Sequence, residues 1–222
     1  GGRRGGGRRG GGWAGLGAFS GLTVRCALAR RDTLARWEVR ERGGPVARTR
    51  LNVTDPARMA ADLKSLARHA GAGAVGITTL TDNALFQGQQ GDYPTAIVVA
   101  LEQDYETMKA VTTRKAAMET VTTYRDVSRI VIRLAAHIRS LGWRARAYGE
   151  SADLLHIPLA INAGLGQLGK HGSVIGTVSG STFRLARALT DMPLALGGPV
   201  DYRVDDLCPG SWPCTPALPA QP

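Results

Sequence analysis

Residues 153–178 read DLLHIPLAINAGLGQLGKHGSVIGTV, and the order of elements in this stretch constrains the fold. The apolar residues before the glycines predict a short helix from Asp153 to Asn162, and the β-branched residues after them predict a strand from Ser173 to Val178. The glycines have the G-x-G-x-x-G spacing of a dinucleotide fingerprint. That fingerprint requires a strand before the glycines and a helix after them, so that the phosphates meet the helix N-terminus. The order here is reversed, which argues against a Rossmann fold.

Upstream of this stretch, hydrophobic periodicity predicts a long helix from about Met118 to Leu141. Gly142 follows at the position where glycine commonly ends a helix. Tyr124 lies on the apolar face of this helix, so periodicity alone predicts a core aromatic residue there. Asp55 and Pro56 have the properties of an N-cap and a first helical residue, which predicts a second helix.

Short apolar runs predict strands at 74–78, 97–101 and 144–148. These strands alternate with the predicted helices, which favours a layered α/β structure.

Charge is concentrated at the N-terminal end of the chain. Residues 1–50 contain 12 arginines and 3 acidic residues, and they begin with the low-complexity run GGRRGGGRRGGG. Glycine-rich sequence loses much entropy on ordering and has little to bury, so residues 1–50 are expected to be disordered. Residues 51–222 contain 16 basic and 15 acidic residues, which removes most of the support for a whole-chain nucleic-acid-binding function.

The sequence contains no run of about 18 apolar residues and hence predicts no membrane span. Twin arginines at 3–4 and 8–9 are followed by glycine rather than by an apolar stretch, so export is not expected. The three cysteines are too few for a disulfide framework and fit a reducing compartment. These features together predict a cytoplasmic protein.

Several blocks of the sequence occur together and in a fixed order. They are IRSLG at 138–142, AGLGQLGKHG at 163–172, STFRL at 181–185, TDMPL at 190–194 and PVDYRVDDLC at 199–208. This set, with Tyr124 upstream, resembles the motifs of the corrinoid- and iron–sulfur-dependent reductive dehalogenases. The resemblance extends from about Thr54 to Leu207 and is much more specific than any one motif.

The resemblance implies an α/β (α+β) fold, with a nitroreductase-like core at residues 51–204 that binds a corrinoid (cobalamin). It also implies two 4Fe-4S clusters in a ferredoxin-like insertion. The implied reaction is removal of halide from a small organohalide by an oxidoreductase that receives its electrons from a donor protein.

The resemblance also assigns candidate site residues. Tyr124 is the proton donor, Arg184 is the cation that stabilises the resulting phenolate, and Ser151 is a polar residue near the substrate. The candidate corrinoid-binding residues lie in the glycine loop: Gly164, Gly166, Gly169, Lys170, His171 and Gly172. Without the resemblance, Arg184 would be interpreted as a solvated surface charge, and two of the glycines as a helix C-cap and a tight turn. His156 lies on an apolar helix and is expected to be a core residue rather than a metal ligand.

The cluster motif at the C-terminal end departs from the family pattern. A cluster of this type needs four thiolates, spaced C-x2-C-x2-C-x3-C-P. In this sequence Cys208 and Cys214 occupy two of the four places, while Ser211 and Leu218 occupy the other two. Residues 205–222 are therefore interpreted as a degenerate remnant of a 4Fe-4S motif. The chain is expected to be a fragment, a degenerate paralogue or a frameshifted product. Its cluster ligands are incomplete, so it is not expected to assemble the clusters, and whether it is active as an enzyme stays open.

Three other functions remain open. The first is that of an epoxyqueuosine reductase, whose family has A-G-L-G-W-I-G-K, so that Gln167 and Leu168 depart from it. The second is non-catalytic corrinoid binding or trafficking, which needs the core but no clusters. The third is RNA binding through the basic N-terminal tail.

Overall fold

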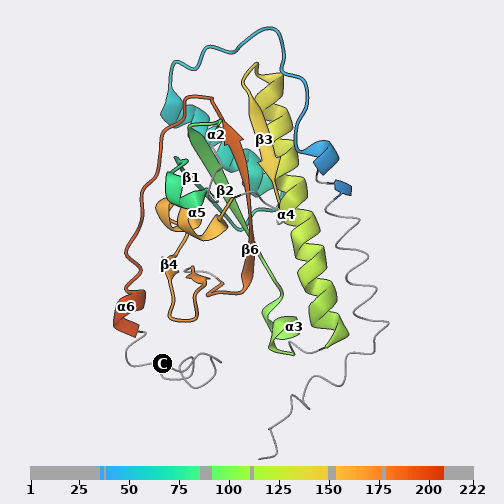
Figure 1. Ribbon diagram of the computed structural model, residues 1–222, viewed down its shortest axis with the longest axis vertical. Coiled ribbons are helices and arrows are strands. Elements are labelled where there is room, and N and C mark those ends of the chain that lie inside the picture. Colours follow the sequence, from blue (N-terminus) through green and yellow to red (C-terminus); the bar gives the residue numbers. More distant parts are fainter. Residues whose placement is uncertain are drawn as a thin grey trace, which may run out of the picture.

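The computed structural model describes residues 36–37, 39–85, 92–110, 113–149, 154–176 and 179–207 (Figure 1). Its central sheet has four strands in the order β1-β2-β6-β3, and every neighbouring pair is antiparallel. These strands are β1 (Ala74–Thr79), β2 (Thr95–Glu102), β3 (Ala145–Tyr148) and β6 (Phe183–Thr190). The mixed helix and sheet fold is confirmed, and the antiparallel pairing makes it an α+β fold rather than a parallel α/β fold.

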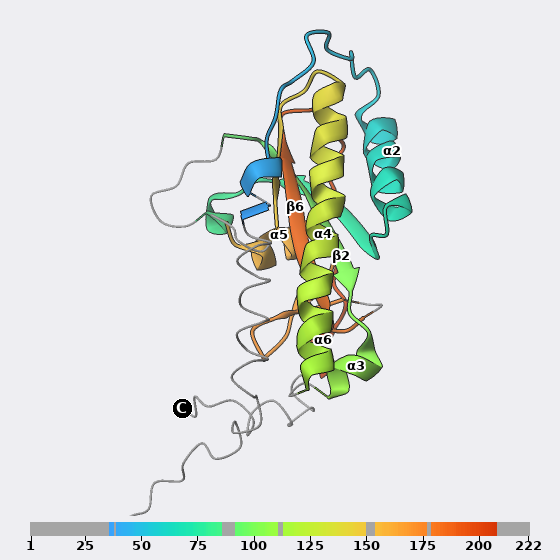
Figure 2. The same cartoon turned by 90° about the vertical axis from the view of Figure 1, so that its right-hand side faces the viewer.

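Helices cover both faces of this sheet. The described elements are α2 (Pro56–His69), η1 (Asp82–Ala84), α3 (Tyr105–Lys109), α4 (Arg114–Ser140), α5 (His156–Asn162) and α6 (Val204–Leu207). Figure 2 shows α2 and α4 on one side of β6 and α5 on the other. The fold therefore has three layers, with the sheet in the middle.

Each face of the sheet has its own apolar core. The larger core joins α2, α4 and the sheet and includes Leu63, Ile77, Ile97, Val131 and Ile138. The smaller core joins α5 and the opposite face and includes Ala96, Val98, Leu159, Ala160 and Leu189. Consecutive residues of β2 contribute to alternate cores, as expected for a strand that is buried on both sides.

The predicted helix signals are confirmed. The Asp55 carboxylate accepts hydrogen bonds from the backbone N–H groups of Ala57 and Arg58, both at 2.9 Å, and Pro56 is the first residue of α2. Helix α4 begins four residues earlier than predicted, where the Thr113 hydroxyl accepts from Ala116 N–H at 3.3 Å. Gly142 follows α4 with φ +83°, the left-handed conformation that glycine tolerates best.

The last part of the basic segment makes backbone hydrogen bonds to the core. Ala147 N–H donates to the Arg42 carbonyl at 2.8 Å, and Ala47 N–H donates to the Arg139 carbonyl at 3.0 Å. Leu51 N–H donates to the Leu141 carbonyl at 2.9 Å. Residues 42–51 thus pack along the edge strand β3 and the end of α4, while residues 1–35 lie outside the described residues.

Two other segments differ from the sequence predictions. Strand β6, at the centre of the sheet, was not predicted as a strand. Within the strand predicted at 173–178, the structure has β5 (Val174–Ile175), which pairs with β4 (Gln167–Leu168) as a short hairpin, and residues 177–178 lie outside the described residues. None of the helices in the described part of the chain is long and apolar enough to cross a membrane.

Candidate functional site

The structure brings Tyr124 and Arg184 into contact. Tyr124 lies in the N-terminal half of α4, and Arg184 is the second residue of β6. The guanidinium carbon of Arg184 lies 4.8 Å from the centroid of the Tyr124 ring, and both side chains are half-buried. This distance is that of a cation–π contact. Arg184 is therefore not the solvated surface charge that its sequence context alone would predict.

Arg184 also has an unused hydrogen-bond donor. Its Nε atom is buried and has no hydrogen-bond partner among the described residues. Buried donors are nearly always paired in folded proteins, with protein, water or ligand. An N–H group of this kind, beside a phenol, is suited to bind an anion or an oxygen atom that enters the site.

A hollow opens at the same end of the sheet as this pair. Its volume is about 750 Å³, and it lies between residues 102–105, which run from the end of β2 to the start of α3, and residues 179–182, which precede β6. The loop after β2 is tied to α4 one turn before Tyr124. The Gln103 amide donates to the Thr120 hydroxyl at 3.2 Å, and Asp104 N–H donates to the Glu119 carboxylate at 2.9 Å. These bonds fix the loop beside the Tyr124 turn of the helix.

Two glycines of the loop are required by packing. A Cβ atom on Gly166 would lie 2.4 Å from Val174 Cγ1, and one on Gly164 would lie 2.7 Å from the Gly198 carbonyl oxygen. Gly164 also has φ +72°, as expected after a helix C-terminus. These two glycines are thus explained by the turn between α5 and the β4–β5 hairpin.

Of the remaining loop residues, Gly169 is buried and closely packed, whereas Lys170 and Gly172 are exposed. A Cβ on Gly169 would lie 2.6 Å from the His171 ring, whereas Gly172, at φ +77°, has no atom within 4 Å of its Cβ position among the described residues. Lys170 is exposed and His171 is half-buried. This outer part of the loop is where a large ligand could approach the backbone.

Sequence reasoning missed the two residues that hold the loop in place. The Gln167 side-chain oxygen accepts hydrogen bonds from the N–H groups of Tyr202, at 3.0 Å, and Val204, at 3.2 Å. The Tyr202 hydroxyl donates to the Gly164 carbonyl at 2.7 Å. The glycine loop is therefore fastened to the segment that leads to Cys208. Both residues lie within motif blocks, and no other sequence signal marks this role.

Three predicted site residues, Ser151, Cys208 and Cys214, lie outside the described residues. Within the described ranges, no group of histidine, cysteine, aspartate and glutamate side chains could hold a metal ion. The predicted 4Fe-4S remnant at 205–222 therefore stays a prediction.

His156 is part of a buried polar pair on the opposite face of β6. The Arg187 side chain is fully buried, and its Nη1 lies 2.8 Å from His156 Nδ1. Arg187 Nη2 donates to the Leu154 carbonyl at 3.1 Å. Burial, and next the charge of Arg187, lower the pKa of His156 to about 3, against a smaller opposing hydrogen bond with the Gly149 backbone. His156 is thus neutral and accepts the Arg187 hydrogen bond.

This pair predicts a loss of stability in mild acid. The unfolded histidine, with its ordinary pKa near 6.5, binds a proton that the folded one excludes, so stability is complete above about pH 6.5 and falls as the pH drops toward 3. Between pH 7 and 5 the free energy of unfolding should fall by about 2 kcal/mol on account of His156. Urea unfolding of the wild type and His156→Gln at both pH values measures this difference. His69→Gln, at the exposed end of α2, is the control, and an unchanged pH dependence in His156→Gln would contradict the assignment.

The sequence and the fold were compared with those of known proteins. No protein-family model matches the chain. A solved catabolic reductive dehalogenase superimposes with a TM-score of 0.77 at 23% sequence identity, over 87% of this chain and 30% of that one. The tetrachloroethene reductive dehalogenase of Dehalobacter restrictus is 31% identical over 125 residues, which are 56% of this chain and 22% of the relative. The epoxyqueuosine reductase of Escherichia coli is 42% identical over 72 residues, which are 32% of this chain and 17% of the relative.

The fold is therefore that of the reductive dehalogenase core. By sequence the chain is a relative of the reductive dehalogenases and, over a shorter segment, of the epoxyqueuosine reductases, which confirms the resemblance carried by the motifs. The chain spans about a fifth of the length of these curated relatives.

Proposed function

We propose that this chain provides the proton-donating half of a reductive dehalogenase site, with Tyr124 as the proton donor and Arg184 as its cationic partner. The observation that supports this most directly is the guanidinium of Arg184, 4.8 Å from the Tyr124 ring centroid at the open end of the sheet. The two residues come from elements about 60 positions apart along the chain. Their contact fits the roles that the resemblance implies.

A corrinoid fits the outer part of the glycine loop. Leu168 at the hairpin is 49% exposed, and Gly172 offers bare backbone beside Lys170 and His171. An exposed apolar side chain next to a glycine backbone that no side chain covers suits a large ring that carries amide groups. The structure of one reductive dehalogenase of this fold suggests a mechanism for B12-dependent dehalogenation by that protein. When bound, a reduced corrinoid would supply the electron pair that cleaves the carbon–halogen bond.

The two side chains would then complete the reaction. As the halide leaves, the Tyr124 hydroxyl gives its proton to the carbon, so a C–H bond replaces the carbon–halogen bond. A tyrosine ordinarily titrates near pH 10, and a neighbouring positive charge stabilises the phenolate that remains. The buried Arg184 Nε–H group is available to the phenolate or to the departing halide.

Electrons must then come from outside the described core. A standard cluster needs four cysteine thiolates, and the motif at 208–219 has two. We propose that an external donor, protein or chemical, reduces the bound cofactor. The substrate class proposed is a small organohalide.

Reconstitution tests this function. The full chain is mixed with hydroxocobalamin, desalted and supplied with titanium(III) citrate and either tetrachloroethene or 3-bromo-4-hydroxybenzoic acid. We expect the visible corrinoid spectrum to coelute with the protein and halide release to exceed that of the same amount of free cofactor. Coelution without a rate above free cofactor would instead support non-catalytic corrinoid binding, and no coelution would refute both.

The epoxyqueuosine reductase function is a second candidate, favoured by the 42% identity over 72 residues. An assay with epoxyqueuosine-containing tRNA and the same reductant separates the two. Formation of queuosine, with no halide release from either organohalide, would favour the second candidate.

A further inference from the structure

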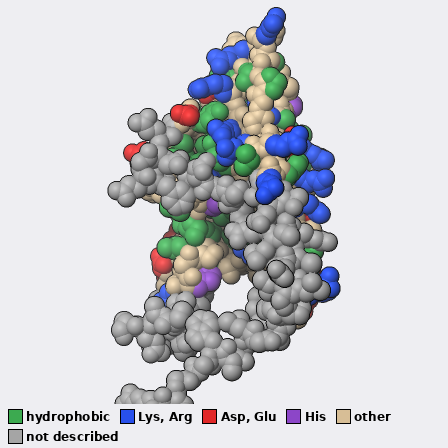
Figure 3. All heavy atoms as spheres, turned by 45° about the vertical axis from the view of Figure 1, so that its right-hand side comes forward, with side chains coloured by type: hydrophobic (Ala, Val, Ile, Leu, Met, Phe, Trp, Pro, Cys, Tyr) green, Lys and Arg blue, Asp and Glu red, His purple; other side chains and the backbone are tan. Residues whose placement is uncertain are grey.

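A pocket rich in arginine lies at the end of the sheet opposite the Tyr124–Arg184 pair. Its volume is about 430 Å³, and it is formed by residues 39–46, the C-terminal end of α4, the start of β3 and Tyr93. Its lining includes five arginines: Arg40, Arg42, Arg139, Arg144 and Arg146. No carboxylate belongs to the lining as far as the chain is described. Figure 3 shows Lys and Arg side chains gathered over this upper part of the molecule.

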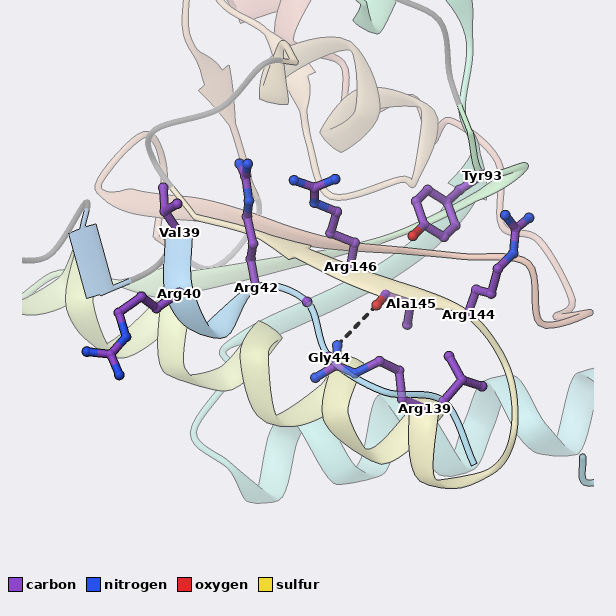
Figure 4. A pocket seen from close by; sticks show the side chains of 11 residues that line it. Val39, Arg40, Arg42, Gly44, Tyr93, Arg139, Arg144, Ala145 and Arg146 are labelled. Carbon is purple, nitrogen blue, oxygen red and sulfur yellow. Dashed lines mark hydrogen bonds between the residues drawn. The ribbon is translucent and has the colours of Figure 1, made fainter. Parts of the chain in front are cut away.

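Two of the arginines, Arg42 and Arg146, extend next to each other at this pocket (Figure 4). In Figure 4, Arg42 and Arg146 extend side by side, with Tyr93 and Arg144 across from them, while Arg40 turns away. Both Arg42 and Arg146 contact the Tyr148 ring, at 6.0 and 5.6 Å from its centroid. Like charges placed together repel each other, and a bound anion would offset that repulsion.

Two of the arginines are held rigidly. The Arg144 Nε atom donates to the Asp191 carboxylate at 2.8 Å, and its guanidinium lies 5.4 Å from the Tyr93 ring centroid. Asp92 adds a weaker attraction to Arg144. Arg139 is 7% exposed, and its Nη1 donates to the Ala145 carbonyl at 3.0 Å. Burial lowers the pKa of Arg139, and an anion nearby would offset this desolvation.

Residues 42–47 close this pocket against β3. Gly44 lies directly over the Arg139 guanidinium, where a Cβ atom would be 3.2 Å from both Nε and Nη2. The backbone bond from Ala147 to Arg42 fixes the segment beside the strand. The basic segment thus contributes a wall of the pocket, which gives it a structural reason to carry arginine.

We infer that this pocket binds a small, multiply charged phosphate compound of the diphosphate class. Guanidinium groups form paired hydrogen bonds with phosphate oxygens. The combined positive charge of several arginines around one space is greater than the single negative charge of a monoanion, which favours a multiply charged ligand. The volume matches that of small-molecule sites. An extended RNA would need a long groove with aromatic stacking platforms, and the pocket is instead short and concave.

This site is separate from the proposed dehalogenase site. Arg184 lies near the start of β6, and Thr190 is the last residue of the strand. The Thr190 hydroxyl donates to the carbonyl of Arg144, a pocket arginine, at 2.8 Å, so this end of β6 lies beside the arginine pocket. Six strand residues correspond to about 20 Å. The inference therefore goes beyond the proposed function and does not depend on it.

Calorimetric titration of the full chain with sodium pyrophosphate tests the inference, with ionic strength held constant by sodium chloride. We expect saturable binding to one site, weaker binding of inorganic phosphate and little binding of acetate. Arg146→Gln and Arg42→Gln should each weaken pyrophosphate binding about tenfold, because each removes a charge-assisted hydrogen bond. Arg146→Lys, which keeps the charge and loses the planar fork, should weaken it less.

Arg129→Gln, on the exposed face of α4, is the matched control and should change binding less than twofold. Circular dichroism of each variant shows whether it remains folded, and a rise of the wild-type melting temperature with pyrophosphate gives a measurement that needs no variant. The inference fails if pyrophosphate neither binds saturably nor raises this temperature, or if Arg129→Gln weakens binding as much as Arg146→Gln. It also fails if oligouridylate binds and pyrophosphate does not displace it.

Discussion

Tyr124→Phe should reduce halide release by the reconstituted chain by at least about 100-fold, the usual effect of removing a general acid. The substitution removes the hydroxyl that gives up the proton and keeps the ring that packs against Arg184, 4.8 Å away. Corrinoid retention on desalting should therefore be unchanged. The measurement is the initial rate of bromide or chloride release at saturating reductant, corrected for the rate with free cofactor.

Tyr93→Phe is the matched control. Tyr93 lies in the arginine pocket at the opposite end of the sheet, with its ring centroid 5.4 Å from the Arg144 guanidinium, so its hydroxyl has no part in the proposed chemistry. Its rate should stay within twofold of the wild type. Equal rates for Tyr124→Phe and the wild type would show that the proton comes from elsewhere, even if dehalogenation itself is observed.

Arg184→Gln separates the role of the cation from that of the phenol. Loss of the positive charge destabilises the phenolate, so the rate should fall while Tyr124 remains in place. Arg184→Lys keeps a charge but lacks the buried Nε–H donor, and it should fall between the wild type and the glutamine variant.

Local signals in the sequence were sufficient for the helices. Asp55 and Pro56 fix the start of α2 because a carboxylate cap and a ring that pre-sets φ act within one turn. The apolar face of α4 was predicted from spacing alone. In the structure Val127, Val131 and Ile138 of this face all lie in the core. The same spacing predicted only a core aromatic at Tyr124, and its role as proton donor beside Arg184 came from the family resemblance.

Strand β6 could not be predicted in this way. Two of its eight residues are arginines and two others are alanines, a composition that favours helix or surface. Arg187 is nonetheless buried because the Leu154 carbonyl and the neutral His156 accept its hydrogen bonds. Those acceptors lie about 30 residues away in sequence. No periodicity within the strand encodes such a partner.

The arginine pocket could not be predicted for a similar reason. Arg42, Arg139 and Arg146 are separated by up to about 100 residues and meet only because residues 42–51 pack along β3. The composition of residues 1–50 predicted a disordered segment instead. Composition gives the number of charges but does not show which charged residues have a surface to pack against.

Gly76→Ala should lower the free energy of unfolding by about 3 kcal/mol or more, the upper range for overpacking a core. Gly76 is in β1, opposite Val98 of β2. A Cβ atom there would lie 2.4 Å from the Ala163 carbonyl oxygen and 2.7 Å from Ala163 Cβ. Backbone and a short side chain cannot rotate away, so α5 would have to move off the sheet. Urea unfolding measures the loss.

The same displacement should weaken the cofactor site, because Ala163 ends α5 and leads directly into Gly164. Gly198→Ala is the matched control: no described atom lies within 4 Å of its Cβ position, although its carbonyl faces the same turn. We expect Gly198→Ala to unfold within about 0.5 kcal/mol of the wild type and to retain corrinoid. If Gly76→Ala were equally stable, α5 would not pack directly on β1. If it were unstable but retained corrinoid fully when folded, the glycine loop would not depend on that contact.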